Sequence, residues 1–186
     1  MTIRRATLAD AESLAALAAR IFTETFAQDT APDDLAAFLA KAYGVRQQSE
    51  EISDPDVITY VAEVPEGLVA YAQVHRGREA PECVDVEEPV ELWRFYVQKD
   101  WHGGGLAHRL MDPVMAAARE LGGRHLWLSV WEHNSRAIAF YGKHGFRDVG
   151  AADFWVGSDC QTDRILVAPV SHPSADACGS SANTGG

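Results

Sequence analysis

A run of glycines stands between an apolar segment, 91–97, and a segment with apolar residues at helical spacing, 106–121. Glycine lets the backbone approach a ligand closely because it has no Cβ, and the start of a helix favours an anionic group. The spacing predicts a phosphate-binding loop, with a plain strand-to-helix turn as the alternative. The expected donors are the backbone N–H groups of Gly103, Gly104, Gly105, Leu106 and Ala107.

Two common phosphate-binding loops are excluded by the residues that follow these glycines. A P-loop needs Lys and then Ser or Thr, but Leu106 and Ala107 stand there. A dinucleotide-binding loop is normally followed, about 20 residues on, by an acidic residue at the end of the next strand. The expected second strand, 124–131, contains no acidic residue. The glycine loop alone therefore does not identify its ligand.

A second segment, 134–146, carries a candidate acid. Asn134 or Ser135 can cap a helix, and Gly145 is suited to end it. Tyr141 lies on the predicted helix, and a tyrosine hydroxyl is neutral at pH 7, so it can donate a proton. Tyr141 is therefore a candidate general acid, although a tyrosine between Phe140 and Phe146 is also typical of a core.

These two segments, in this order, resemble the GNAT family of acyl-CoA-dependent N-acetyltransferases. The pyrophosphate loop of that family follows Arg/Gln-x-x-Gly-x-Gly/Ala. The later helix of the family carries, in this order, an Asn, an Ala, a Phe or Leu directly before a Tyr, and then Gly-Phe. The similarity covers about 3–167, and the chain looks like the PaiA type, which acetylates polyamines such as spermidine and spermine. Four segments carry this resemblance to the PaiA type: 23–26, 91–97, 127–132 and 161–163.

The resemblance implies an α/β domain with the GNAT fold, in which two parallel central strands splay apart and admit the pantetheine arm of acetyl-CoA. It implies that backbone groups of Phe95 and Val97 pair with the pantetheine amides. The glycine loop would hold the pyrophosphate, and Asn134 would bond the cofactor, unless it only caps its helix. Tyr141 would protonate the leaving thiolate. The first position of the loop pattern is His102 in place of Arg or Gln, so acetyl-CoA affinity could be weaker or pH-dependent.

The amine acceptor also needs a base, because an amine with a pKa near 10.4 is neutral in only about one molecule in 2,500 at pH 7. Glu91 begins the central strand and is the candidate base or amine anchor, with a solvent-facing strand end as the alternative. An acidic cluster precedes it and could attract a cationic amine, or could simply be a solvated loop. The cluster consists of Glu82, Asp85, Glu87 and Glu88. Phe22, Phe26 and Tyr43 could line the acceptor cleft or pack in the core.

The composition limits the classes of function. A chain of 186 residues can form one domain with a core, predicted for 1–168, and the Ser- and Gly-rich segment 169–186 is expected to be disordered. The net charge of −11 argues against nucleic-acid binding. The sequence contains no apolar run of about 20 residues, the length that would predict a membrane span. The three cysteines and seven histidines show no CxxC or HExxH spacing, so no metal is expected. A cytoplasmic protein is the simplest interpretation.

Two alternatives remain open from the sequence. The acceptor could be an amino acid, an antibiotic or a peptide N-terminus. The chain could also be a CoA-binding regulatory module without catalysis, as His102 and Pro113 would suggest. Pro113 predicts a kink or break near Met111 because proline removes one helical hydrogen bond. The resemblance also makes a homodimer a reasonable expectation.

Overall fold

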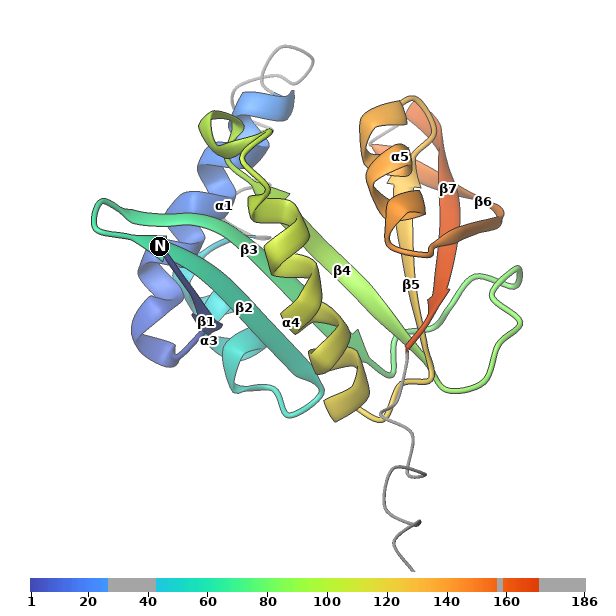
Figure 1. The fold of residues 1–186 in the computed structure, drawn as a ribbon, viewed down its shortest axis with the longest axis horizontal. Helices are drawn as coiled ribbons and strands as arrows, with labels where there is room; N and C mark the ends of the chain where they lie inside the picture. Colours follow the sequence, from blue (N-terminus) through green and yellow to red (C-terminus); the bar gives the residue numbers. More distant parts are fainter. Residues whose placement is uncertain (27–42, 157–158, 171–186) are drawn as a thin grey trace, which may run out of the picture.

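The computed structural model describes residues 1–26, 43–156 and 159–170. Its mixed sheet has the order β1-β2-β3-β4-β5-β7-β6 and is flanked by helices (Figure 1). The strands are β1 Thr2–Arg5, β2 Val57–Val64, β3 Gly67–Arg76, β4 Pro89–Val97, β5 His125–Trp131, β6 Arg147–Val156 and β7 Asp159–Pro169. The helices are η1 Leu8–Asp10, α1 Ala11–Phe26, α3 Val45–Ser53, η2 Lys99–Trp101, α4 Leu106–Glu120 and α5 Ser135–Lys143.

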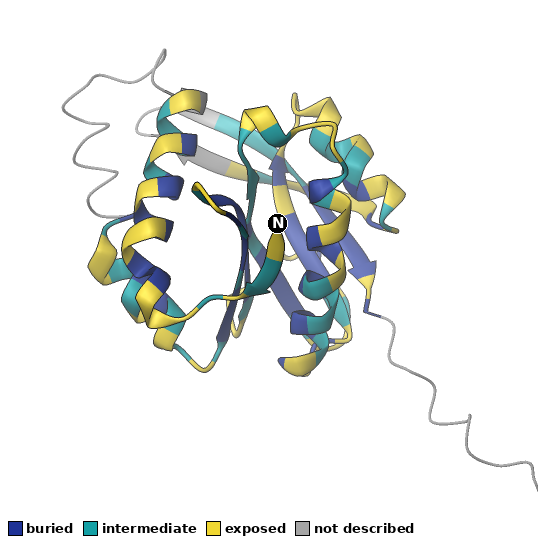
Figure 2. Ribbon diagram, turned by 60° about the vertical axis from the view of Figure 1, so that its left-hand side comes forward, coloured by how far each residue is buried: buried dark blue, intermediate teal, exposed yellow. Residues whose placement is uncertain are grey.

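The helices cover both faces of the sheet because each has one apolar side. Leu14, Leu17 and Ile21 recur at helical spacing in α1 and pack on Val61 and Tyr71 of the sheet. The buried residues of α4 and α5 belong to the larger cluster on the opposite face, which also contains alternate residues of β4 and β5. In Figure 2 the buried residues line the sides of the helices that face the sheet.

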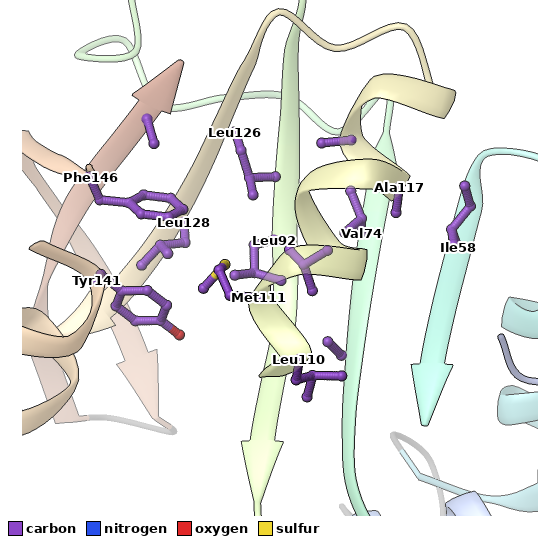
Figure 3. Packing of buried hydrophobic residues seen from close by; sticks show 14 of the residues in the cluster. Ile58, Val74, Leu92, Leu110, Met111, Ala117, Leu126, Leu128, Tyr141 and Phe146 are labelled. Atoms are coloured by element: carbon purple, nitrogen blue, oxygen red, sulfur yellow. The ribbon is translucent and has the colours of Figure 1, made fainter. Parts of the chain in front are cut away.

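Helix α4 continues through Pro113, so the predicted break near Met111 is wrong. Leu110, Met111, Val114 and Ala117 are each no more than 1% exposed. Figure 3 shows Leu110, Met111 and Ala117 beside the central strands, near Leu92 and Val74. Burial of a single large apolar side chain contributes about 1.5–3 kcal/mol, so packing of this face outweighs the cost of about 3 kcal/mol for one proline.

Strand β4 loses its parallel neighbour part-way along. It pairs with β5 only at Pro89↔His125, Val90↔Leu126 and Glu91↔Trp127. On its other side β5 pairs antiparallel with β7 along its whole length, from His125↔Pro169 to Trp131↔Asp163. Within the described residues, the edge of β4 from 92 to 97 therefore has no strand beside it, and the predicted splay is confirmed (Figure 1).

A bulge on β4 lies just beyond the point where the strands part. Leu92 pairs with Val74 and Arg94 pairs with Gln73, which leaves Trp93 as the extra residue. Nη1 of the buried Arg94 lies 2.6 Å from Oε2 of Glu51 on α3 and donates to Oε1 of Gln73 at 2.6 Å. A buried ion pair of this kind is costly to break from one side, because it leaves an uncompensated charge. The pair therefore fixes the bulge against α3.

The folded part extends slightly beyond the predicted boundary at 168. Pro169 ends β7, and the buried Val170 donates its backbone N–H to the Arg124 carbonyl at 2.8 Å. The rest of the predicted tail, 171–186, lies outside the described residues. In the part of the chain that the structure describes, no helix is both long enough and apolar enough to cross a bilayer.

Candidate active site

The free edge of β4 presents backbone groups of two predicted site residues. Gln98 donates its N–H to Val69 of β3 at 2.9 Å. Residues of an antiparallel strand direct their backbone groups alternately to its two sides, so Tyr96 shares this direction. Phe95 and Val97 therefore direct their N–H and C=O groups to the opposite side, where β5 has turned away. The geometry leaves both N–H groups and the Phe95 carbonyl available to an extended ligand, whereas the Val97 carbonyl is already bonded by His102.

The glycine loop supplies a second set of unpaired donors. Gly103 and Gly105 have φ values of 81° and 78°, in the left-handed region that costs other residues about 1–2 kcal/mol. Gly105 is the N-cap of α4, and its carbonyl accepts from Arg109 at 3.1 Å. Among the described residues, none of the backbone N–H groups from Gly103 to Ala107 donates a hydrogen bond to another backbone group. Orphan donors at the start of a long helix fit a pyrophosphate.

His102, at the start of the glycine loop, contacts both β4 and α5. Its Nε2 lies 2.8 Å from the Val97 carbonyl oxygen, and its Nδ1 lies 3.0 Å from Nη1 of Arg136 on α5. A carbonyl only accepts and a guanidinium only donates, so in this arrangement Nε2 of His102 is the donor to Val97 and Nδ1 is the acceptor from Arg136. Arg136 was not predicted from the sequence, although an arginine in the first turn of the helix that begins after Asn134 could have indicated it.

Asn134 caps α5, as the alternative interpretation of this residue proposed. Its Oδ1 accepts from the Ala137 backbone N–H at 3.1 Å. Its Nδ2 donates to no other group within the described residues. The side chain is exposed, so its amide remains able to donate to a ligand while its oxygen holds the helix.

Tyr141 is buried at the inner side of α5. Its ring centroid lies 6.2 Å from that of Phe95 and 5.4 Å from that of Phe146. Figure 3 shows its hydroxyl oxygen pointing away from Phe146, toward the side on which β4 and α4 lie. The hydroxyl has no hydrogen-bond partner among the described residues. Burial raises the pKa of Tyr141 well above its usual value, so the phenol keeps its proton at neutral pH.

Glu91 is the last residue of β4 that pairs with β5, and its side chain is only 8% exposed. The solvent-facing alternative for this residue is therefore wrong. Burial raises the pKa of Glu91, and Arg78, whose Nε lies 2.7 Å from Oε2, offsets part of that rise. A carboxylate with a raised pKa is a stronger base near neutral pH.

Glu91 and Tyr141 lie toward opposite faces of the sheet. Tyr141 belongs to the apolar cluster that contains Val90 and Leu92, and strand alternation turns Glu91 to the other face. The structure does not bring the two side chains into contact. Glu91 lies where β4 and β5 part, and Tyr141 contacts Phe95 on β4 beyond that point.

A cluster of aromatic rings and an arginine lies on the same face of the sheet as Glu91. The Arg94 guanidinium lies 3.8 Å from the Trp93 ring centroid and 5.0 Å from that of Tyr43. Tyr43 in turn lies 5.6 Å from Phe22, whereas the side chain of Phe26 lies outside the described residues. The sequence reasoning missed Trp93 and Arg94, because nothing local predicted the bulge.

The acidic loop before β4 is folded onto the sheet. Val84 packs against Trp127, Ile165 and Val167, and Glu87 forms an exposed ion pair with Arg124 at 2.6 Å. Within the described ranges, no group of three or more His, Cys, Asp or Glu side chains is placed to hold a metal ion.

Comparison with known proteins identifies the family. The sequence model of the acetyltransferase (GNAT) family matches residues 14–146. An uncharacterised N-acetyltransferase of Mycobacterium bovis is 32% identical over 160 residues, which cover 86% of this chain and 97% of that protein. A probable spermine N(1)-acetyltransferase of Bacillus subtilis subsp. natto is 30% identical over 77 residues, 40% of this chain and 51% of its own.

Solved structures share the fold. The crystal structure of the PaiA N-acetyltransferase from Thermoplasma acidophilum in complex with coenzyme A superposes with a TM-score of 0.68 at 20% identity. The match covers 90% of this chain and 98% of that one. Together with the family match, these findings show that the chain belongs to the acetyltransferase (GNAT) family and is an N-acetyltransferase that uses acetyl-CoA as its donor.

Proposed function

We propose that this enzyme acetylates the primary amine of a polyamine such as spermidine, or of another small cationic amine. The observation that carries the proposal is the buried Glu91 carboxylate at the point where β4 and β5 part, where Arg78 contacts both this carboxylate and the Trp93 ring. A buried carboxylate next to an aromatic face is suited to a cation. The net charge of −11, the PaiA neighbour and the partial similarity to a probable spermine acetyltransferase support the same class.

The donor would lie along the free edge of β4. Phe95 and Val97 would bond its pantetheine amides, and the backbone N–H groups from Gly103 to Ala107 would bind its pyrophosphate. Arg136 would add a positive charge beside that loop, where the family pattern has Arg or Gln and this chain has His102. Bound acetyl-CoA supplies a thioester carbonyl to the amine. Holding both reactants in one gap supplies much of the acceleration.

Proton transfers would be divided between the two faces of the sheet. Glu91, directly or through a water molecule, would take the proton from the attacking amine, and its raised pKa favours this role. Tyr141 would give its proton to the departing sulfur, because burial keeps its hydroxyl neutral until a strong base forms beside it. Attack would be direct, without a covalent enzyme intermediate.

An amino-acid acceptor is the second candidate, and one observation favours it. The guanidinium groups of Arg78 and Arg94 both lie over Trp93, at 4.6 Å and 3.8 Å from its ring centroid. Guanidinium groups are well suited to bind carboxylates. An acceptor with a carboxylate beside its amine would use one of them.

Incubation with acetyl-CoA and spermidine near neutral pH tests the proposal directly. Mass spectrometry should detect spermidine heavier by one acetyl group, with one free thiol released per product. A panel of amino acids serves as the comparison. Acetylation of amino acids without acetylation of spermidine would contradict the polyamine proposal and support the second candidate.

Replacement of Tyr141 by Phe should lower kcat by about 10²–10⁴-fold, the usual contribution of a general acid. Acetyl-CoA affinity, measured by calorimetry, should change little because the ring and its packing remain. Tyr60→Phe removes a hydroxyl from β2, away from the gap, and should leave kcat unchanged. Equal turnover in wild-type enzyme and Tyr141→Phe would remove this residue as the acid.

The Gly105→Ala variant should bind acetyl-CoA about tenfold more weakly, a loss of about 1.4 kcal/mol. A Cβ would meet no protein atom within 4 Å, but φ of 78° disfavours alanine, so the loop would rotate its N–H groups out of position. Gly122→Ala is the matched control, since Gly122 has φ of 80° and open space at the other end of α4. Both variants should lose similar stability, and only Gly105→Ala should lose affinity. Equal affinities would argue against the loop as the pyrophosphate site.

A further inference from the structure

Arg78 occupies a place that is suited to a substrate cation. It stands in the loop between β3 and β4, and its Nε lies 2.7 Å from Oε2 of Glu91. Its guanidinium carbon lies 4.6 Å from the Trp93 ring centroid. The Arg78 side chain is 40% exposed and that of Glu91 is 8% exposed, so a solvent-accessible cation covers a buried anion.

The contact between Arg78 and Glu91 is short but poorly directed. Oε2 of Glu91 accepts no hydrogen bond of acceptable geometry, although the Arg78 nitrogen is close enough. Buried carboxylate oxygens usually receive well-directed donors. Charge attraction therefore holds this pair, and the Glu91 oxygen keeps its capacity to accept a better-placed donor.

The Trp93 ring also contacts a second cation and a histidine. The Arg94 guanidinium lies 3.8 Å from the ring centroid and is itself fixed by Glu51 and Gln73. His75 meets the ring edge-on with its centroid at 5.9 Å. Because Arg94 is buried and Arg78 is partly exposed, Arg78 is the cation that can leave without disturbing the core.

We propose that Glu91 and Trp93 form a subsite for an ammonium group of the acceptor, and that Arg78 fills this subsite in the free protein and leaves it when the amine binds. The choice of a cationic acceptor rests on the proposed function. Exchange of one cation for another keeps the buried carboxylate compensated throughout. An ammonium has three rotatable donors, so it can direct one of them at Oε2, and it can also lie over the Trp93 ring.

If Arg78 competes with the amine, its removal should strengthen amine binding. We expect Arg78→Ala to bind spermidine about tenfold more tightly than wild type by calorimetry, without acetyl-CoA. Arg124→Ala is the matched control, because Arg124 forms an exposed ion pair with Glu87 of the same loop and the change in net charge is identical. The control should show little gain. Equal affinity in Arg78→Ala and Arg124→Ala would overturn the proposal.

A second substitution tests whether the tighter spermidine binding depends on Glu91. Adding Glu91→Gln to Arg78→Ala should abolish the tighter binding, because it removes the anion of the subsite. A gain that survives in the double variant would also contradict the proposal. If Arg78→Ala does not fold, Arg78→Gln keeps most of the side-chain length and serves the same comparison. These affinities are measured without acetyl-CoA, so they do not depend on turnover. If the enzyme failed to acetylate spermidine, the result of the binding comparison could still be judged by itself.

An observation on the wild-type protein completes the test. The Arg78 Nε–H resonance, assigned by its loss in Arg78→Gln, should shift on titration with spermidine to the same midpoint as the calorimetric binding. An unchanged resonance at saturation would show that Arg78 stays in place, and would overturn the exchange.

Discussion

The structure depends on one loss of pairing: β4 and β5 pair only as far as Glu91 and Trp127, and beyond that point β5 keeps only β7 as its neighbour. Backbone N–H and C=O groups are normally paired inside a protein, so a central strand with a free edge is an unusual feature. A free strand edge is also a template for an extended ligand that carries amide groups. The pantetheine arm of acetyl-CoA is such a ligand, and the family to which this chain belongs uses it.

The bulge at Trp93 decides which groups face that edge. One extra residue reverses the alternation of β4, so Phe95 and Val97 present their backbone to the gap, and Glu91 and Arg94 both face α3. The buried Arg94–Glu51 pair then holds the bulge. Strand alternation places Glu91 on the face opposite the apolar cluster that contains Tyr141, and the bulge brings Arg94 to the same face as Glu91.

The glycine loop, the capped helix at Asn134 and the candidate acid Tyr141 could be predicted from sequence, because each depends on local chemistry. The splay was expected from the family resemblance and not from periodicity. The contacts of Glu91 with Arg78 and of His102 with Arg136 join distant segments, so no local pattern indicated them. The expected break at Pro113 failed because the packing of α4 on the sheet outweighs one missing hydrogen bond. Burial of Glu91, also nonlocal, rules out the solvated strand end.

Amide hydrogen exchange along β4 tests the central claim most directly. The account predicts that saturating acetyl-CoA slows exchange at Phe95 and Val97, on the order of tenfold or more, because these groups gain partners only from the ligand. Gln98, which donates to Val69 of β3, and Tyr96, which shares its direction, should be protected with or without the donor. Unchanged exchange at both Phe95 and Val97 in the saturated enzyme would contradict the account, because acetyl-CoA would then bind elsewhere than along the free edge of β4.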